Sequence, residues 1–452
     1  MRQFCIDWGA SAKTWADVRF ASLLPRHLQA RLLGGWFWSL AGALASQTGI
    51  LGSSILVARL LGVEQYGRFA LLQSTVVMLG ILAGLGLGIT TTRAVAALRD
   101  TRPGDAGRII GFCLTLSTAA GALISVLFYW SASWFSAAVF GSAGLSTELR
   151  IASLLLLTNT IAATQSATLM GFEAFRSLAG TGVARGAVSP VLVVAGTLNY
   201  GLRGAIGGLV AGTLVQIVWN QVLILRQCER HQAPLSVRLA GSDFGVLWRT
   251  SLPALLSSAI VVPANWVTNV FLSRIPGGFT ELAVFSAANQ WRTGIQFVPT
   301  LLGQVSLPML SSLHHRREVA GYRAVLRTGL LLVAGMTSCA AVGVSLCSPL
   351  IMRAYGPDYV RGIPVLIALS AAAAAGATCQ VIGNAIASVD RMWWGLAFNA
   401  VWVVILLLFA RVLAPQWGAL GVACAVLIAY VVHGGLVAGY TRRARIFSTS
   451  GA

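Results

Sequence analysis

The chain reads Tyr200-Gly201-Leu202-Arg203-Gly204-Ala205-Ile206-Gly207 ahead of one long apolar run and Gln416-Trp417-Gly418-Ala419-Leu420-Gly421 ahead of another. Two further pairs have nearly the same spacing: Phe140-Gly141 with Tyr355-Gly356, and Leu56-Val57-Ala58-Arg59-Leu60-Leu61-Gly62 with Phe271-Leu272-Ser273-Arg274-Ile275-Pro276-Gly277. The offset is about 215 residues each time. Three matches at nearly one offset indicate an internal repeat. Two repeated bundles that rock against each other are the usual anatomy of a transporter.

The composition is that of a membrane protein. Hydrophobic residues make up 56% of the 452 residues and charged residues only 10%, whereas soluble domains carry roughly 25% charged residues. A spanning helix needs roughly 20 apolar residues. About twelve segments qualify: 34–57, 69–91, 109–130, 151–170, 179–198, 204–225, 251–271, 282–304, 329–350, 363–387, 394–413 and 418–440. They lack the polar–apolar alternation of a β-barrel, so we predict an all-α integral membrane protein of about 12 transmembrane helices in two pseudo-symmetric six-helix bundles.

The repeat and the loop lengths predict five regions. Residues 1–32 mix aromatic and basic side chains, which is typical of an amphipathic cytoplasmic segment lying on the membrane; a tail without regular structure is the alternative. An N-terminal bundle follows at 33–226, a cytoplasmic linker at 227–250, a C-terminal bundle at 251–440 and a basic cytoplasmic tail at 441–452. The external loops are too short to hold an enzyme domain, so we do not expect an enzyme.

The net charge of +19 is mostly a topology signal. If the N-terminus is cytoplasmic, the cytoplasmic segments hold about twenty-two Lys and Arg residues, and the external loops and span ends hold about eight. A cytoplasmic excess of these residues sets the orientation of membrane proteins. We therefore predict that both termini are cytoplasmic, that anionic membrane lipids attract the basic loops, and that nucleic acid is not a partner.

Negative charge is missing from the predicted spans. All 13 acidic residues fall in loops or at span ends, and His433 is the only histidine inside a span. Proton-driven carriers and exporters of cationic drugs usually need a buried carboxylate or a histidine relay, and metal sites need clusters of such ligands. The seven cysteines form no metal-ligand pair and are expected to be small buried apolar groups. We expect no metal, no cofactor and no catalytic residue.

Positive charge, by contrast, lies inside the spans. Arg292 falls midway along the eighth span and Arg185 falls in the fifth. A mid-membrane arginine costs at least about 2.5–3.5 kcal/mol, so each should face a water-filled cavity or an anionic ligand. The repeat places Arg59 and Arg274, which end the first and seventh spans, across the central axis from each other. The alternatives are capping of a broken helix by Arg292 or Arg185, and snorkelling of the other two to the interface.

Amide side chains extend this polar set. Asn265 and Asn269 share one face of the seventh span, Asn289 and Gln296 share a face of the eighth with Arg292, and Gln47 lies in the first span. Guanidinium groups match phosphate oxygens with a fork of donors. A cavity lined by positive charge and amides, without acid, predicts a phosphate-bearing sugar as the substrate.

Three motifs carry a family resemblance. They are Ala58-Arg59-Leu60-Leu61-Gly62-Val63-Glu64-Gln65-Tyr66-Gly67-Arg68-Phe69-Ala70, the turn formed by Tyr355-Gly356 and Tyr359, and Trp417-Gly418-Ala419-Leu420-Gly421. With these motifs the chain resembles the O-antigen and polysaccharide flippases (Wzx type) of the multidrug/oligosaccharidyl-lipid/polysaccharide exporter superfamily. The similarity extends from Gly34 to Tyr440.

The resemblance implies translocation of a polyprenyl-pyrophosphate-linked oligosaccharide from the cytoplasmic to the periplasmic leaflet of a bacterial inner membrane, for cell-surface polysaccharide biosynthesis. The two bundles would alternate in access around a cationic cavity. A polysaccharide polymerase and a chain-length regulator are the implied partners. Lipid II flippases of this superfamily have fourteen spans, and its multidrug exporters carry an N-terminal carboxylate that nothing here matches. The alternative is a multidrug or small-solute antiporter of the same fold.

Overall fold

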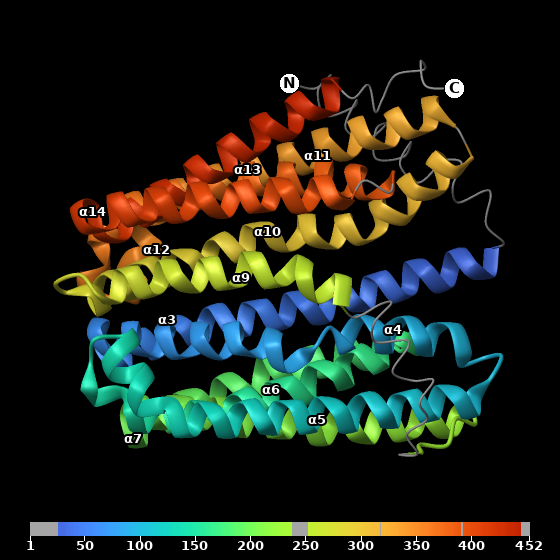
Figure 1. Ribbon diagram of the computed structural model, residues 1–452, viewed down its shortest axis with the longest axis horizontal. Helices are drawn as coiled ribbons and strands as arrows, with labels where there is room; N and C mark the ends of the chain where they lie inside the picture. Colours follow the sequence, from blue (N-terminus) through green and yellow to red (C-terminus); the bar gives the residue numbers. More distant parts are fainter. Residues whose placement is uncertain (1–25, 237–251, 317, 390–391, 444–452) are drawn as a thin grey trace.

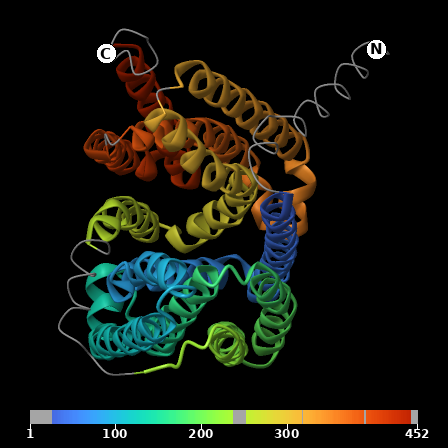
Figure 2. The same ribbon diagram turned by 90° about the vertical axis from the view of Figure 1, so that its right-hand side faces the viewer.

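The computed structural model describes residues 26–236, 252–316, 318–389 and 392–443, and its regular elements there are helices in two groups that lie side by side (Figures 1 and 2). The first group holds α3 (Arg26–Gly84), α4 (Leu87–Leu98), α5 (Pro103–Trp134), η1 (Phe135–Val139), η2 (Ala143–Leu145), α6 (Ser146–Gly171) and α7 (Phe175–Arg230). The second holds α9 (Leu252–Ser273), α10 (Gly278–His315), α11 (Val319–Leu346), α12 (Ser348–Tyr355), η4 (Pro357–Gly362), α13 (Ile363–Ser388) and α14 (Met392–Arg443).

Glycines in a left-handed or related conformation mark equivalent points of the two halves. Positive φ angles occur at Gly62 and Gly277, at Gly141 and Gly356, and at Gly201 and Gly418. The backbone angles of the last pair nearly coincide, with φ 57° and ψ −134° at Gly201 and φ 55° and ψ −128° at Gly418. Residues with a Cβ atom rarely adopt such angles. The repeat predicted from these sequence motifs is therefore a structural repeat.

The same glycines account for the number of spans. α7 is 56 residues long, far more than the roughly 20 residues that cross a bilayer. It turns at Gly201 and folds back, since a methyl group at Gly204 would lie 1.8 Å from the carbonyl oxygen of Gly196. Gly62 breaks α3 and Gly418 breaks α14 in the same way. With α3, α7 and α14 counted as two arms each, α4 taken as the continuation of the second arm of α3 and the short α12 left out, the described helices give the predicted twelve spans in two six-helix bundles.

Two predicted spans differ in detail from the structure. The second, 69–91, is interrupted: α3 ends at Gly84, the left-handed Leu85 and Gly86 follow, and α4 begins at Leu87. The ninth, 329–350, runs past the end of α11, because Pro349 cannot continue that helix and instead lies in the first turn of α12. Most of the predicted segment 1–32, the linker 227–250 and the tail 441–452 lies outside the described residues.

An apolar core joins the halves, and apolar side chains also cover the outside. Leu71 and Leu156 of the first half belong to the same buried cluster as Val284 and Leu369 of the second. Six described helices are long and apolar enough to cross a membrane. Bulky residues such as Trp130 stay exposed on the outer surface, as expected of side chains that face lipid. The chain is therefore a multi-pass membrane protein.

Gly201→Ala should destabilise the protein by about 1–3 kcal/mol, because alanine is strained at this φ and ψ. The matched control is Gly207→Ala in the following arm, where a Cβ meets open space and the backbone is helical. We expect this control to be neutral or stabilising, by up to about 1 kcal/mol. Thermal unfolding of the two variants in detergent measures the difference. Equal melting temperatures would contradict the requirement for glycine at 201.

Candidate cationic site between the two halves

Arg292 and Asn289 form a polar pair on α10. The Arg292 Nε donates a 2.6 Å hydrogen bond to the Asn289 Oδ1, and both side chains are half-buried. Their spacing of three residues places them on one helix face, as predicted. In the part of the chain that the structure describes, Arg292 has no ion pair with an acidic side chain. Its positive charge is therefore available to an anionic ligand.

Gln47 and Gln296 lie on different sides of α10. A methyl group at Gly294 would lie 4.0 Å from the Gln47 Nε2, so this amide of α3 faces α10 on the side of Gly294, about 200° around the helix from Arg292. The Gln296 Nε2 would lie 2.8 Å from a methyl group at Gly376 of α13. Gln47 thus contacts α10 from the first half on the side away from Arg292, whereas Gln296 packs against α13 of its own half.

α9 contributes two half-buried amides. Asn265 donates from Nδ2 to the carbonyl oxygen of Val261 at 2.8 Å, and the Oδ1 of Asn269 is buried without a hydrogen-bond partner. Between them, Trp266 donates from Nε1 to the Thr75 Oγ1 of α3 at 3.0 Å. α9 therefore lies along the seam with α3. A buried acceptor without a partner is costly, so Asn269 is a candidate contact for a ligand or a water molecule.

Arg185 lies in a separate cavity of about 230 Å³ within the first half. The side chains that line it come from α3, α6 and both arms of α7, and all of them belong to that half. The structure therefore does not bring Arg185 together with Arg292. Hydropathy predicts the depth of each arginine in the membrane, but it does not predict which helix face is turned inward.

Arg59 and Arg274 hold the two halves together at one end of the molecule. Arg59 donates from Nε to the carbonyl oxygen of Ala354 and from Nη2 to that of Arg353, at 3.4 Å. Arg274 donates to the carbonyl oxygens of Val139, at 2.7 Å, and Ala138. We call these two contacts the arginine clasps. The two arginines are 215 positions apart, and so are their carbonyl partners.

The clasps give both arginines a different setting from the shared cavity that we predicted. Each side chain is exposed, and each satisfies carbonyls at the end of a short helix, η1 or α12, that belongs to the opposite half. Terminal carbonyls of a helix have no partner within it, and arginine is a common capping group there. The clasps obey the same pseudo-symmetry as the glycines.

An aromatic cluster that the sequence analysis did not identify lies beside the clasps. Tyr355 shares a 2.8 Å hydrogen bond with the Ser54 hydroxyl of α3, and the Tyr359 ring packs edge-on against Tyr66 with centroids 6.2 Å apart. Phe140 of the first half packs edge-on against Trp266 of α9 in the second half. The repeated pairs Phe140-Gly141 and Tyr355-Gly356 were the sequence signal that could have identified this cluster. Each aromatic residue of that pair contacts the first helix of the opposite half.

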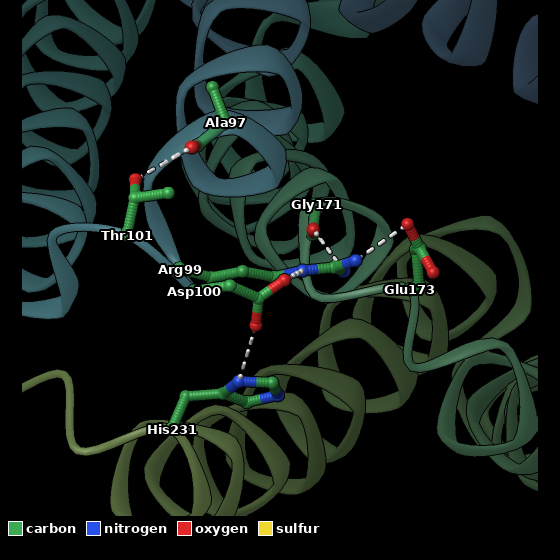
Figure 3. A network of polar contacts seen from close by, with 7 residues as sticks. All are labelled: Ala97, Arg99, Asp100, Thr101, Gly171, Glu173 and His231. Carbon is green, nitrogen blue, oxygen red and sulfur yellow. Dashed lines mark hydrogen bonds and ion pairs between the residues drawn. The ribbon is translucent and has the colours of Figure 1, made fainter.

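The opposite end of the first half is fixed by a polar network within that half (Figure 3). The guanidinium of Arg99, buried at 6% exposure, donates to the Gly171 carbonyl oxygen at 3.0 Å, to the Glu173 Oε1 at 2.6 Å and to the Asp100 Oδ2 at 3.3 Å. His231 lies 3.6 Å from the second oxygen of Asp100. The network ties the turns after α4 and α6 to the end of α7. It stabilises one half and does not join the two.

An antiporter of the same fold would need a buried, unpaired carboxylate, and Glu173 and Glu281 are the two candidates. Both form hydrogen bonds or ion pairs at helix ends. Glu173 is exposed and paired with Arg99. Glu281 accepts the backbone N–H of Ala419 at 2.8 Å and forms a 2.9 Å ion pair with Arg361. Neither is an unpaired carboxylate in a cavity, which an exporter of cationic drugs would need.

Comparisons with known proteins agree with this architecture. The profile of a family described as "Polysaccharide biosynthesis protein" matches residues 32–314. The EPS I polysaccharide export inner membrane protein EpsE of Ralstonia nicotianae is 26% identical over 90% of this chain and 93% of its own. The lipid III flippase of Escherichia coli is 24% identical over 89% and 96%. An inward-facing MATE family multidrug transporter of the MOP superfamily shares the fold, with a TM-score of 0.76 and 17% identity over 91% of this chain and all of its own.

These comparisons confirm the predicted two-bundle fold and the prediction that the chain is not an enzyme.

Proposed function

The chain belongs to the polysaccharide biosynthesis protein family, and from this premise we propose that it is a flippase for a polyprenyl-pyrophosphate-linked oligosaccharide. It moves the sugar head from the cytoplasmic to the periplasmic leaflet of the bacterial inner membrane while the polyprenyl tail stays in lipid. Relatives named as a polysaccharide export inner membrane protein and a lipid III flippase support this substrate class. Lipid-linked glycans of cell-surface polysaccharides are the proposed cargo.

One observation carries the proposal: Arg292 lies on α10, which packs against α3 of the other half, donates a hydrogen bond to Asn289 and has no acidic partner among the described residues. The amide of Gln47 approaches another side of the same helix from the other half. A guanidinium with neighbouring amides suits a pyrophosphate and its attached sugar, because the first supplies charge and the others pair with hydroxyls. The ligand would thus be held by Arg292 and Asn289 of the C-terminal half.

The clasps support alternating access. They join the halves at the end that carries Gly62, Gly141, Gly277 and Gly356. The distribution of arginines along the sequence predicts that this end is periplasmic. A structure closed there corresponds to an inward-facing state, and the similarity in fold to an inward-facing transporter supports the same reading. Opening toward the periplasm requires both clasps to break. The cargo would leave from that end.

Energetics favour outward movement of this cargo. An elementary charge that crosses 100 mV changes free energy by about 2.3 kcal/mol. A pyrophosphate moves outward down an inside-negative potential, so its export needs no proton relay through a buried carboxylate. Transport is therefore driven at least partly by the membrane potential.

Arg292→Ala should lower flipping at least tenfold and leave a folded protein, because it removes the charge that pairs with pyrophosphate. The assay uses inverted vesicles with a labelled polyprenyl-pyrophosphate oligosaccharide and measures protection of the sugar from an external glycosidase. Arg411→Gln, on the exposed side of α14, is the matched control and should flip normally. Normal flipping by Arg292→Ala would make Arg292 a structural residue. If the native protein protected none of the glycans tested, the small-solute antiporter would be favoured.

An imposed potential should change the rate in the same vesicles. A lumen-positive potassium diffusion potential places the positive side where the cargo is delivered, so we expect faster protection than at zero potential. A lumen-negative potential should slow it. A rate that ignores the potential would remove this driving force from the mechanism.

Breaking both clasps should open the periplasmic end. Arg59→Gln with Arg274→Gln removes charged hydrogen bonds worth about 2 kcal/mol together at this exposed site, roughly a thirtyfold shift in the equilibrium. Spin labels on Leu60 and Asp358, exposed residues of opposite halves near one clasp, report the opening as a longer distance in pulsed EPR. Arg150→Gln is the control, since Arg150 stacks on Tyr129 within one half. An unchanged distance distribution in the double variant would rule out the clasps as a gate.

A further inference from the structure

The cavity around Arg185 holds more polar side chains than packing requires. It lies inside the first half, and six of its lining residues are polar: Gln73 of α3, Asn159 of α6, and Arg185, Ser189, Thr213 and Gln216 of α7. The remaining lining residues are apolar or glycine, and none of those described is acidic. The cavity therefore combines one fixed positive charge with several neutral donors and acceptors.

Most of these side chains are unpartnered. Gln73, Asn159, Arg185 and Gln216 form no hydrogen bond or ion pair with the rest of the described chain, whereas Thr213 donates to its own helix at 2.8 Å. Four helical arms thus direct three amides and a guanidinium into one space. Polar groups without partners in a membrane bundle are costly. Water can satisfy the amides, but the charge of Arg185 lacks a counter-charge.

The size and charge of the cavity restrict its ligand. About 230 Å³ is less than the roughly 300–1,000 Å³ of sites for drug-sized molecules, so the cavity itself encloses about one sugar ring. Arg185 and Asn159 are exposed, so the rest of a longer glycan would extend out of it. A single guanidinium pairs in a bidentate way with one carboxylate. A pyrophosphate would bring at least two negative charges to one positive charge. Amides and hydroxyls on the surrounding arms suit the hydroxyl groups of a pyranose.

We infer that this cavity binds one acidic sugar unit, a pyranose that carries a carboxylate, within the cargo. The inference rests on the proposed function and adds a second binding element to it. Arg292 on α10 of the C-terminal half would hold the pyrophosphate, and the Arg185 cavity of the N-terminal half would select the glycan. Because the two elements lie in different halves, the cargo bridges the bundles that must move.

The test is a binding titration on the purified full-length protein in detergent, followed by saturation-transfer NMR. The probes are methyl β-D-glucuronide and methyl β-D-glucoside, which differ only by a carboxylate in place of a hydroxymethyl group. The native protein should bind the glucuronide at least tenfold more tightly than the glucoside. Arg185→Gln should weaken glucuronide binding at least tenfold, as expected for the loss of a charged hydrogen-bond pair. Arg411→Gln should keep it.

A second variant guards against misfolding of the first. Asn159→Asp places a carboxylate in the same cavity, where it would pair with Arg185 and exclude the glucuronide, and its thermal unfolding is checked in parallel. Equal binding of the two probes, no glucuronide binding by the native protein, or full binding by both cavity variants would overturn the inference. If the protein flips a neutral glycan in vesicles but does not bind the glucuronide, the role of this cavity is contradicted and the proposed flippase function is not. Glucuronide binding without any flipping would count against the proposed function.

Discussion

Helix ends inside or beside a membrane need partners for their last carbonyl groups, and this constraint explains how the two halves are joined. In η1 and α12 the carbonyls are satisfied by an arginine of the opposite half, Arg274 in one direction and Arg59 in the other. Each half thus pairs terminal carbonyls of the other at this end. The contact consists of hydrogen bonds at an exposed site, so its donors and acceptors can exchange for water.

The absence of acid near the polar centres is the second constraint. Arg292 has an amide as its described partner, and Arg185 has none. An acidic neighbour would have neutralised either arginine and made insertion cheaper, so the exposed positive charges come at a cost to stability. Such a cost is retained where a ligand offsets it. The carboxylates of the described chain instead stabilise helix ends, as Glu281 does by accepting the N–H of Ala419 and pairing with Arg361.

The fold could be predicted from sequence because its signals are long and repeated. Twelve apolar runs and three motifs at one offset determine the bundles, and the glycines of those motifs have the positive φ angles that only glycine tolerates easily. Shorter features were missed: the break at Leu85 and the separate helix α12 depend on one or two residues inside apolar sequence. The site was harder to predict. Span depth locates Arg59, Arg185, Arg274 and Arg292, but the direction of each side chain depends on how the helices pack.

The separation of the two arginine types has a mechanical consequence. Arg59 and Arg274 contact backbone of the opposite half, so in the proposed alternating-access cycle they would oppose movement between the bundles, whereas Arg185 lies in a cavity of one half and would keep those surroundings. The Arg99 network at the far end likewise stays inside the first half, which preserves that bundle as a rigid unit. The guanidinium of Arg99, which acts within one half, is buried, whereas the guanidinium groups that join the halves at the closed end are exposed. A transporter that rocks rigid bundles requires this distribution, because only the second set has to break.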